Sequence, residues 1–389
     1  MRFCNANIFQ PEFGFRTGSF EVENGIFSKV CFDDETDPSG VNLDGAFVIP
    51  GLIDIHTHGN SNADFSDGNV DGFYSMAKYM LRNGVTSFLP TSMTLPIDTL
   101  EKVFHSAYEF VSQDHPECAD VLGIHMEGPF LSEKHKGAQN PEYLRLPEYA
   151  AFQKLQKASG NLIKIVDVAP ELEGAIDFIN ELDQKKNDLE IPIISIAHTD
   201  ADYNAAKKAF DSGAKHVTHL FNAMPSLHHR NPGVIGAACD REDVTVELIC
   251  DGIHVHPSVV RMVFRLFPHR VCLISDSLRC CGMPDGKYEL AGQSVILKSG
   301  EARLSDGTLA GSVTNLFDCM KKAIEFGIPM VSAIEAATLT PAKCLGLENK
   351  KGAIKAGNDA DFIICNEKLD IMNVSIRGQS EGSIRGTVL

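Results

Sequence analysis

The chain has 389 residues, of which 43% are hydrophobic, so it can bury the core of one large domain and of a smaller one beside it. Its formal net charge of −17 at pH 7 argues against nucleic acid or an anionic membrane as a partner, and an anionic ligand would need a local basic pocket. It has no apolar stretch of membrane length and no signal-peptide pattern in residues 1–10, and its eleven cysteines lack zinc-finger spacing, which predicts a soluble cytoplasmic protein.

The first 49 residues have strand-like patterns and no helical period. The pieces are RFCNANIF, SFEVENGIFSKV and GAFVIP, with turns expected at Gly18, Gly25 and Gly45. A similar piece, AGNDADFIICN, lies near the C-terminus. We therefore expect residues 1–49 and 346–389 to pair into one small β domain, beside a second domain formed by residues 50–345.

Residues 50–345 alternate short apolar runs with amphipathic segments, the pattern of strand–helix units around a parallel sheet. No glycine-rich dinucleotide motif follows the first run, so a TIM-like (β/α)₈ barrel is favoured over an open doubly wound sheet. The eight runs are LIDIHTHG, TSFLPTS, VLGIHMEGP, IKIVDVAPE, IPIISIAHTD, HVTHLFNAM, VTVELICDGIH and VCLISDS.

Two further segments of this domain carry clear patterns. The segment DTLEKVFHSAYEF predicts a helix between the second and third runs. After the eighth run, KYELAGQSVILKSGEARL predicts a hairpin-like excursion before the last helix. The helix should bury one face formed by Leu100, Val103, Phe104, Ala107 and Val111.

The first barrel strand, LIDIHTHG, ends in two histidines separated by a single threonine. Side chains alternate faces along a strand, so His56 and His58 point to the same side and can share one cation. For an isolated His-x-His pattern, two partly buried histidines without a ligand are the alternative. The other strand ends have to decide between these interpretations.

Residues that can bind metals end six of the eight predicted strands. Active sites of such barrels lie at the C-terminal ends of the strands, so four imidazoles and two carboxylates are expected to meet there. This set predicts a site for one or two divalent ions, and its ligands suit Zn²⁺ or Fe²⁺, with Mn²⁺ or Co²⁺ as alternatives. The four imidazoles are those of His56, His58, His198 and His219, the two carboxylates are those of Glu127 and Asp276, and the seventh strand approaches a further histidine, His254.

Such a site predicts metal-assisted hydrolysis. The ligands leave one position open for a water molecule, whose pKa can fall from about 16 to about 7. Asp276 can take the proton of the attacking water and pass it to the leaving group. Glu127 can ligate one ion or bridge two.

Two loops indicate an anionic substrate. The loop FNAMPSLHHRNPG follows His219 and combines the backbone amides of Asn222 and Ala223 with the guanidinium of Arg230, a set that suits a phosphate. A solvated surface loop is the alternative. In DGIHVHP, His254 can donate to a carbonyl group or a phosphate.

Three neighbouring residues are interpreted as non-catalytic. His125 shares the face of Glu127 and is expected to pack there or to support a ligand. Cys280 and Cys281 are expected to be inert thiols because no histidine is adjacent.

The motifs PGLIDIHTHG, HMEGPF, IAHTDAD, VTHLFNAM, DGIHVHP, SDS, DGTLAGS, LTPAKCLGL and GNDADFII follow one another along the chain. Together they resemble the amidohydrolase superfamily, and within it the branch that acts on N-acetylglucosamine 6-phosphate, over nearly the whole sequence. The resemblance implies a distorted (β/α)₈ barrel with a small β-sandwich formed by both termini, in a cytoplasmic homodimer. It also implies hydrolysis of the N-acetyl group to glucosamine 6-phosphate and acetate, a step of amino-sugar catabolism.

The same resemblance assigns roles to individual positions. Glu127, His198 and His219 match the principal metal ligands, and Asp276 matches the acid/base aspartate. The chain keeps the His-x-His pair that some members lack, which implies a second metal. Gln139 stands among the substrate-binding positions where other members have a histidine, so the group that polarises the acetyl carbonyl stays open. The other expected substrate-binding residues are Ala138, Asn222, Ala223, Arg230, Asp251, His254, Leu309, Ala310 and Gly311.

Three alternatives remain at this point. The sequence does not separate the gluco from the galacto sugar phosphate. A cyclic-amide hydrolase of the same superfamily would usually present a carboxylated lysine at a strand end, where this chain has Glu127. A non-catalytic barrel scaffold is the alternative of another class, but it should have lost metal ligands that this chain keeps.

Overall fold

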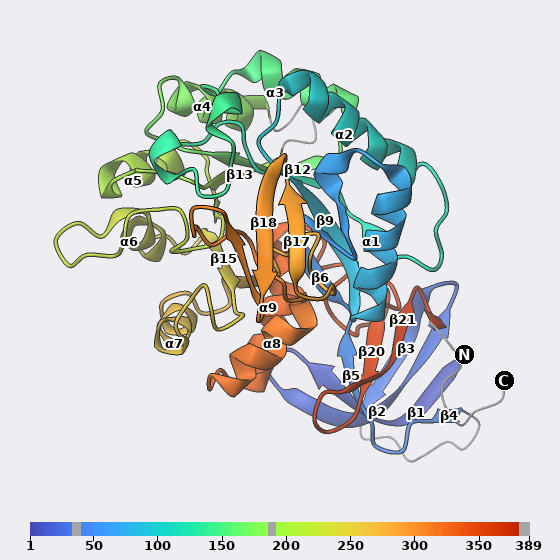
Figure 1. Cartoon of the computed structure of the whole chain (residues 1–389). Helices are drawn as coiled ribbons and strands as arrows, with labels where there is room; N and C mark the ends of the chain where they lie inside the picture. Colours follow the sequence, from blue (N-terminus) through green and yellow to red (C-terminus); the bar gives the residue numbers. More distant parts are fainter. Residues whose placement is uncertain (33–39, 186–191, 381–389) are drawn as a thin grey trace.

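The computed structural model describes residues 1–32, 40–185 and 192–380. Eight parallel strands follow one another around a nearly closed barrel, as the sequence predicts (Figure 1). A hydrogen bond of 2.9 Å from the amide of Asp276 to the carbonyl oxygen of His56 joins the two ends of the sheet. The strands are β6 (Leu52–Thr57), β9 (Val85–Ser92), β10 (Asp120–Val121) with β11 (Ile124–Met126), β12 (Ile163–Val168), β13 (Ile193–Ile196), β14 (His216–Val217), β15 (Thr245–Ile249) and β16 (Val271–Ile274).

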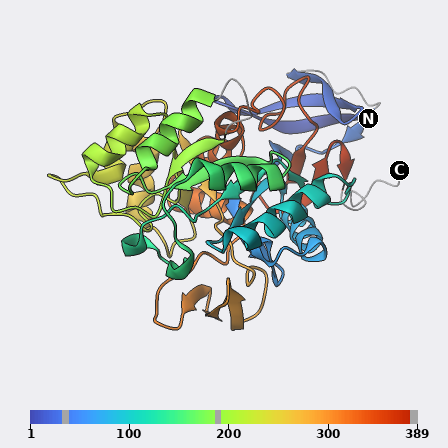
Figure 2. The ribbon, with the colours of Figure 1, turned by 90° about the horizontal axis from the view of Figure 1, so that it is seen from above.

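Helices surround the barrel on its outer side (Figures 1 and 2). The predicted helix is α2, but its buried face differs at the C-terminal end. Val111 is 41% exposed, whereas Phe110 is buried with its ring centroid 4.6 Å from that of Phe73. Val111 is the last helical residue, so the larger ring before it takes the core position. The helices are α1 (Val70–Arg82), α2 (Ile97–Val111), α3 (Tyr149–Ala158), α4 (Ala175–Lys185), α5 (Tyr203–Asp211), α6 (Gly233–Cys239), α7 (Pro257–Leu266), α8 (Leu316–Glu325), α9 (Met330–Ala337) and α10 (Leu339–Cys344).

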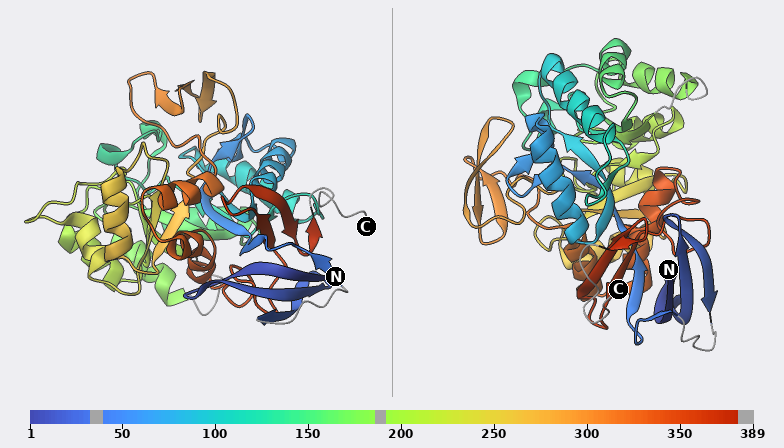
Figure 3. Two further views of the ribbon diagram at one scale, coloured as in Figure 1. Left: turned by 90° about the horizontal axis from the view of Figure 1, so that it is seen from below. Right: turned by 90° about the vertical axis from the view of Figure 1, so that its right-hand side faces the viewer.

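Both chain ends contribute to one further sheet beside the barrel (Figure 3). β5 joins the two parts because it pairs with β1 on one side and with β20 on the other. The rings of Phe3, Phe20, Phe27 and Phe362 pack in its core. The strands are β1 (Arg2–Gln10), β2 (Gly14–Glu23), β3 (Ile26–Phe32), β4 (Val41–Asn42), β5 (Phe47–Pro50), β20 (Phe362–Cys365), β21 (Ile371–Ile376) and β22 (Gln379–Ser380).

The expected turn at Gly18 is wrong, because Gly18 lies inside β2. A Cβ atom at this position would lie 2.2 Å from the carbonyl oxygen of Cys31, so the glycine permits close approach of β3 rather than a turn. The turn lies instead at residues 11–13, while Gly25 and Gly45 occupy turns as predicted. The domain boundaries at residues 49 and 346 stay a proposal.

The predicted excursion follows β16 and forms a three-stranded antiparallel sheet of β17 (Gly286–Leu290), β18 (Gln293–Lys298) and β19 (Glu301–Leu304). In Figure 2 it stands away from the barrel. Its inner face packs on Leu278 and Ala310, which follow β16 and β19. In the described part of the chain, three helices rather than one come after it, namely α8, α9 and α10. Among the described residues, no helix is both long and apolar enough to cross a membrane.

The barrel interior is divided along its length. One part holds an apolar cluster in which Ile53, Ile55, Leu89, Ile165 and Ile249 pack together, and Ala342 of α10 joins this cluster. Histidines and carboxylates occupy the C-terminal ends of the strands, where a substrate can enter.

Candidate metal centre and substrate pocket

The six predicted metal-binding side chains meet at the C-terminal ends of five barrel strands. All six are buried, and they form two groups in which one donor atom from each residue lies within 4.8 Å of the others. The groups are Glu127, His198 and His219, and His56, His58 and Asp276.

In the first group, Oε1 of Glu127 lies 2.8 Å from Nε2 of His198 and 3.1 Å from Nε2 of His219. These two nitrogens are themselves 3.1 Å apart. Nδ1 of His198 lies 2.8 Å from the carbonyl oxygen of His135, to which it must donate, so Nε2 carries the lone pair in the neutral ring. Lone pairs that face one another in a buried space need a cation or a proton between them. These residues therefore fit a divalent metal.

In the second group, each histidine uses one nitrogen as a donor. Nδ1 of His56 lies 2.8 Å from Oε2 of Glu247, and Nδ1 of His58 lies 3.1 Å from the carbonyl oxygen of Thr91. The Nε2 atoms of His56 and His58 lie 3.6 and 3.3 Å from Oδ1 of Asp276. Among the described residues, Nε2 of His56 has no hydrogen-bond partner. A buried nitrogen in this state fits a second ion.

Glu127 links the two groups, because its Oε2 lies 3.2 Å from Nε2 of His58. Three of the six residues have left-handed backbones, with φ of 41° at His198, 31° at His219 and 48° at Asp276. Such conformations cost on the order of 1 kcal/mol or more for residues with a Cβ, and they persist where the surrounding structure enforces them. The strand ends are thus held in a shape that aims these side chains at one another.

The electrostatics of the cluster favour bound positive charge. Burial disfavours ionised carboxylates, but hydrogen bonds and charges from the imidazoles outweigh it and lower the pKa of Glu127 and of Asp276. Burial likewise disfavours protonated imidazoles, but the carboxylates raise the pKa of His219 to about 9 and that of His58 well above its usual range. A bound divalent ion supplies this positive charge in place of the protons.

Glu247, a buried carboxylate in β15, is not among the residues predicted from the sequence. Its Oε2 accepts a hydrogen bond from Nδ1 of His56 at 2.8 Å and from the backbone amide of His219 at 3.1 Å. Its other oxygen lies 3.1 Å from Nε2 of His216. Glu247 therefore orients side chains of both groups. The available signal was an acidic residue inside the apolar run VTVELICD.

The surroundings of His125, Cys280 and Cys281 fit their interpretation as non-catalytic residues. Both nitrogens of His125 are engaged, one at 3.0 Å from Oδ1 of Asp167 and the other at 3.0 Å from the carbonyl oxygen of Ile55. Burial raises the pKa of Cys280 to about 11 and that of Cys281 to about 12, so both stay protonated.

A cavity of about 300 Å³ opens onto the cluster. Most of the predicted site residues line it: His58, Glu127, Ala138, Gln139, His198, His219, Asn222, Ala223, His254, Asp276, Leu309, Ala310 and Gly311. Met93, Gly137, Leu278, Leu290 and Thr308 line it without having been predicted. Leu290 comes from the excursion of β17, β18 and β19. The sequence did not indicate that this excursion would reach the cavity.

Two predicted substrate-binding residues lie outside the cavity lining. Asp251 supports His254, with Oδ2 2.7 Å from Nδ1 of the ring. Burial disfavours a charged His254, but the hydrogen bond and charge of Asp251 outweigh it and raise the pKa of His254. Arg230 is exposed on the segment between β14 and α6, which projects from the barrel (Figure 1), and its Nη1 lies 2.6 Å from Nε2 of His229.

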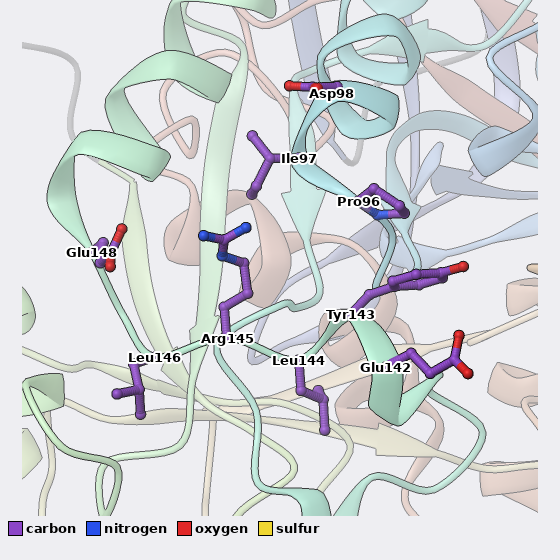
Figure 4. A pocket seen from close by; sticks show the side chains of 9 residues that line it. All are labelled: Pro96, Ile97, Asp98, Glu142, Tyr143, Leu144, Arg145, Leu146 and Glu148. Carbon is purple, nitrogen blue, oxygen red and sulfur yellow. The ribbon is translucent and has the colours of Figure 1, made fainter.

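A larger hollow of about 650 Å³ lies between the start of α2 and residues 142–148. Figure 4 shows the guanidinium of Arg145 pointing toward Ile97, with Asp98, Glu142 and Glu148 spread around the edge. Among the described residues, none that lines this hollow belongs to a group that could hold a metal ion.

Comparison with known proteins finds similarity over most of the chain. The amidohydrolase family matches residues 47–388. The N-acetylglucosamine-6-phosphate deacetylase of Bacillus subtilis (strain 168) is 36% identical over 372 residues, which cover 93% of this chain and 92% of the relative. The N-acetylgalactosamine-6-phosphate deacetylase of Escherichia coli O157:H7 is 34% identical over 337 residues, covering 86% and 88%.

Solved structures of proteins with the same name as the B. subtilis relative are also similar to this chain. The N-acetylglucosamine-6-phosphate deacetylase of Pasteurella multocida superposes with a TM-score of 0.90 at 26% identity, covering 98% of this chain and 99% of that one. A Mycobacterium smegmatis enzyme of the same name, in complex with N-acetyl-D-glucosamine-6-phosphate, also gives 0.90, at 28% identity and 98% coverage of both chains.

Proposed function

The chain belongs to the amidohydrolase family, and we propose that it hydrolyses the N-acetyl group of N-acetylglucosamine 6-phosphate to glucosamine 6-phosphate and acetate. One observation carries this proposal: Glu127, His198 and His219 open onto the same cavity as Asp276 and His254. A metal-binding set, a carboxylate and an imidazole that can donate to a phosphate thus surround a space of about 300 Å³.

The metal centre is proposed to hold one or two divalent ions, with Zn²⁺ or Fe²⁺ favoured over Mn²⁺ or Co²⁺. Glu127, His198 and His219 would hold the first ion, and His56 and His58 a second. When bound, the metal supplies the positive charge that polarises the acetyl carbonyl and activates water.

Proton transfer is assigned to Asp276. Its lowered pKa keeps the carboxylate ionised at neutral pH, which is the form that accepts a proton from the attacking water. The carboxylic acid then donates this proton to the amide nitrogen, because an amine leaves poorly unless it is protonated. One side chain at the cavity wall can serve both steps.

The phosphate is proposed to lie near Asn222, Ala223 and His254, which line the cavity beside the metal-binding set. Arg230 lies outside the cavity of its own chain, on a projecting segment where Leu227 is also 40% exposed. We therefore add a proposal about the predicted homodimer. This segment contacts the partner subunit, so that Arg230 of one subunit binds the phosphate in the cavity of the other.

The galacto sugar phosphate is the second candidate substrate, because the E. coli relative named for it is 34% identical, almost as similar as the B. subtilis relative. The two sugars differ only in the configuration at one carbon. A cytoplasmic location is proposed because all eleven cysteines are free thiols in the structure.

The decisive experiment measures acetate release from both N-acetylated sugar phosphates and from unphosphorylated N-acetylglucosamine, with metal content determined on the same preparation. We expect a high kcat/KM for the gluco sugar phosphate and a far lower one for the unphosphorylated sugar. A preference for the galacto sugar phosphate would move the assignment to the second candidate. Stoichiometric metal without acetate release from any of the three would overturn the deacetylase proposal.

A further inference from the structure

Gln139 is buried between the end of β9 and the metal-binding carboxylate. Its Oε1 lies 2.7 Å from the backbone nitrogen of Thr94, and its Nε2 lies 2.9 Å from Oε2 of Glu127. A backbone amide can only donate and an ionised carboxylate can only accept, so these two partners fix the orientation of the carboxamide. Gln139 therefore accepts from Thr94 and donates to Glu127.

These contacts leave little of the carboxamide for a substrate. The oxygen is engaged by Thr94, and one of the two N–H groups by Glu127. The nearest further acceptor of Nε2 is the sulfur of Met93 at 3.8 Å, which is a weak one. To polarise the acetyl carbonyl with the N–H that Glu127 accepts, Gln139 would have to break a charge-assisted hydrogen bond to a buried partner. Only its second N–H, which has the weak sulfur acceptor, remains for another group.

We propose that Gln139 is a positioning residue: by holding Oε2 of Glu127, it presents Oε1 to the ion between His198 and His219. This inference rests on the metal site of the proposed function, but not on its reaction or substrate. It also ranks the two ion sites. A second ion at His58 would have to share Oε2 with the N–H of Gln139, so the second site binds more weakly than the first.

The test compares two variants at Gln139 with a control at Gln293 of β18, which contacts the same loop. Gln139→Met has similar size but removes both polar contacts, whereas Gln139→His keeps one acceptor and one donor. Gln293→Ala removes the 2.6 Å hydrogen bond from Nε2 of Gln293 to the carbonyl oxygen of Ala138. This control loosens the loop without touching Glu127.

Each protein is stripped of metal and titrated with Zn²⁺ against a chelator, without substrate. Supporting partners of metal ligands typically contribute about 10- to 100-fold to affinity. We expect Gln139→Met to lose that much at the tighter site, Gln139→His to keep most of the affinity, and Gln293→Ala to bind as the wild type does. In the wild type, two separate binding steps are expected, the second weaker.

The opposite result is equally clear. Wild-type Zn²⁺ affinity in Gln139→Met, with a lower kcat for acetate release, would assign Gln139 to the substrate and overturn the proposal. Thermal unfolding of the metal-free proteins shows whether Gln139→Met is folded. If it is not folded, the test compares Gln139→His with Gln139→Asn, whose side chain is too short to reach both partners. The proposal then requires Gln139→His to bind Zn²⁺ more tightly than Gln139→Asn, and the opposite result overturns it. Because no substrate is present, failure of the deacetylase assignment would leave these measurements unchanged.

Discussion

Oδ1 of Asp276 lies 3.3 Å from Nε2 of His58, within the second metal-binding group. The same carboxylate lines the substrate cavity, where proton transfer would take place. These two roles of Asp276 compete, because a carboxylate that binds an ion tightly has less capacity to accept a proton. The proposed mechanism therefore needs Asp276 free when water attacks, which a strongly bound first ion and a weak second one would allow.

Replacing Asp276 by Asn should remove proton transfer while preserving the fold. The backbone of Asp276 is held by its own amide, which donates to His56 at 2.9 Å, so the strand end does not depend on the carboxylate. We expect kcat to fall by roughly two to four orders of magnitude, the usual contribution of a general acid or base. KM and the tighter metal site should change little. A loss below about tenfold would assign proton transfer to another group.

The two metal groups should differ in their response to mutation. His198→Ala removes a ligand that faces both Glu127 and His219, so we expect loss of all tightly bound metal and of activity. His56→Ala removes a residue of the second group only, and at most one equivalent should be lost. Elemental analysis of both variants against the wild type measures this difference. Wild-type metal content in His198→Ala would contradict the assignment of the first site.

Much of this site could be predicted from the sequence because a parallel barrel collects the C-terminal ends of its strands in one place. A strand that ends in His or Glu can be recognised in the sequence as an apolar run followed by that residue. The barrel fold then brings the ends of the strands together in space. The metal-binding residues were accessible in this way, and the structure brings them together.

Features that depend on packing across the chain were not accessible. Glu247 lies in the middle of a strand, and its contact with His56 joins residues 191 apart in sequence. Leu290 reaches the cavity from the excursion, whose direction is set by tertiary packing. The turn at Gly18 failed for a similar reason, since a neighbouring strand requires that glycine.

The affinity for the phosphate group should depend on the charge of His254. Burial disfavours the charged ring, but the hydrogen bond and charge of Asp251 outweigh it and raise the pKa of His254, so the ring keeps its charge to a higher pH than an ordinary histidine and loses it as the pH rises through that raised pKa. A cation favours a phosphate, and the contact is therefore present at lower pH and lost at higher pH. KM for the phosphorylated sugar should rise on the alkaline side, with no matching rise for the unphosphorylated sugar.

Asp251→Asn provides the matched variant for this pH dependence. It keeps the size of the side chain but removes the charge that raises the pKa, so the increase in KM should begin at lower pH than in the wild type. His254→Asn should make the ratio of the two KM values independent of pH. An unchanged pH profile in Asp251→Asn would show that His254 does not control phosphate binding.

The last prediction concerns Arg230, which is exposed and outside the cavity of its own chain. If a partner subunit receives it, Arg230→Ala should lower kcat/KM for the phosphorylated sugar by about one to two orders of magnitude, as expected for one charge-assisted contact of about 1.5–3 kcal/mol. The slow reaction with the unphosphorylated sugar should barely change.

Mixed dimers then show which of the two subunits Arg230 serves. In a dimer of one Arg230→Ala and one His198→Ala subunit, one site would combine an intact metal centre with an intact arginine from its partner. Such hybrids, isolated with two different affinity tags, should recover about half of the activity of the wild-type dimer, whereas each parent variant alone stays impaired. If verified hybrid dimers showed no recovery, Arg230 would act only on its own subunit. Because it lies outside the cavity of that subunit, its effect would be structural, and His254 with the amides of Asn222 and Ala223 would then be the groups left to bind the phosphate.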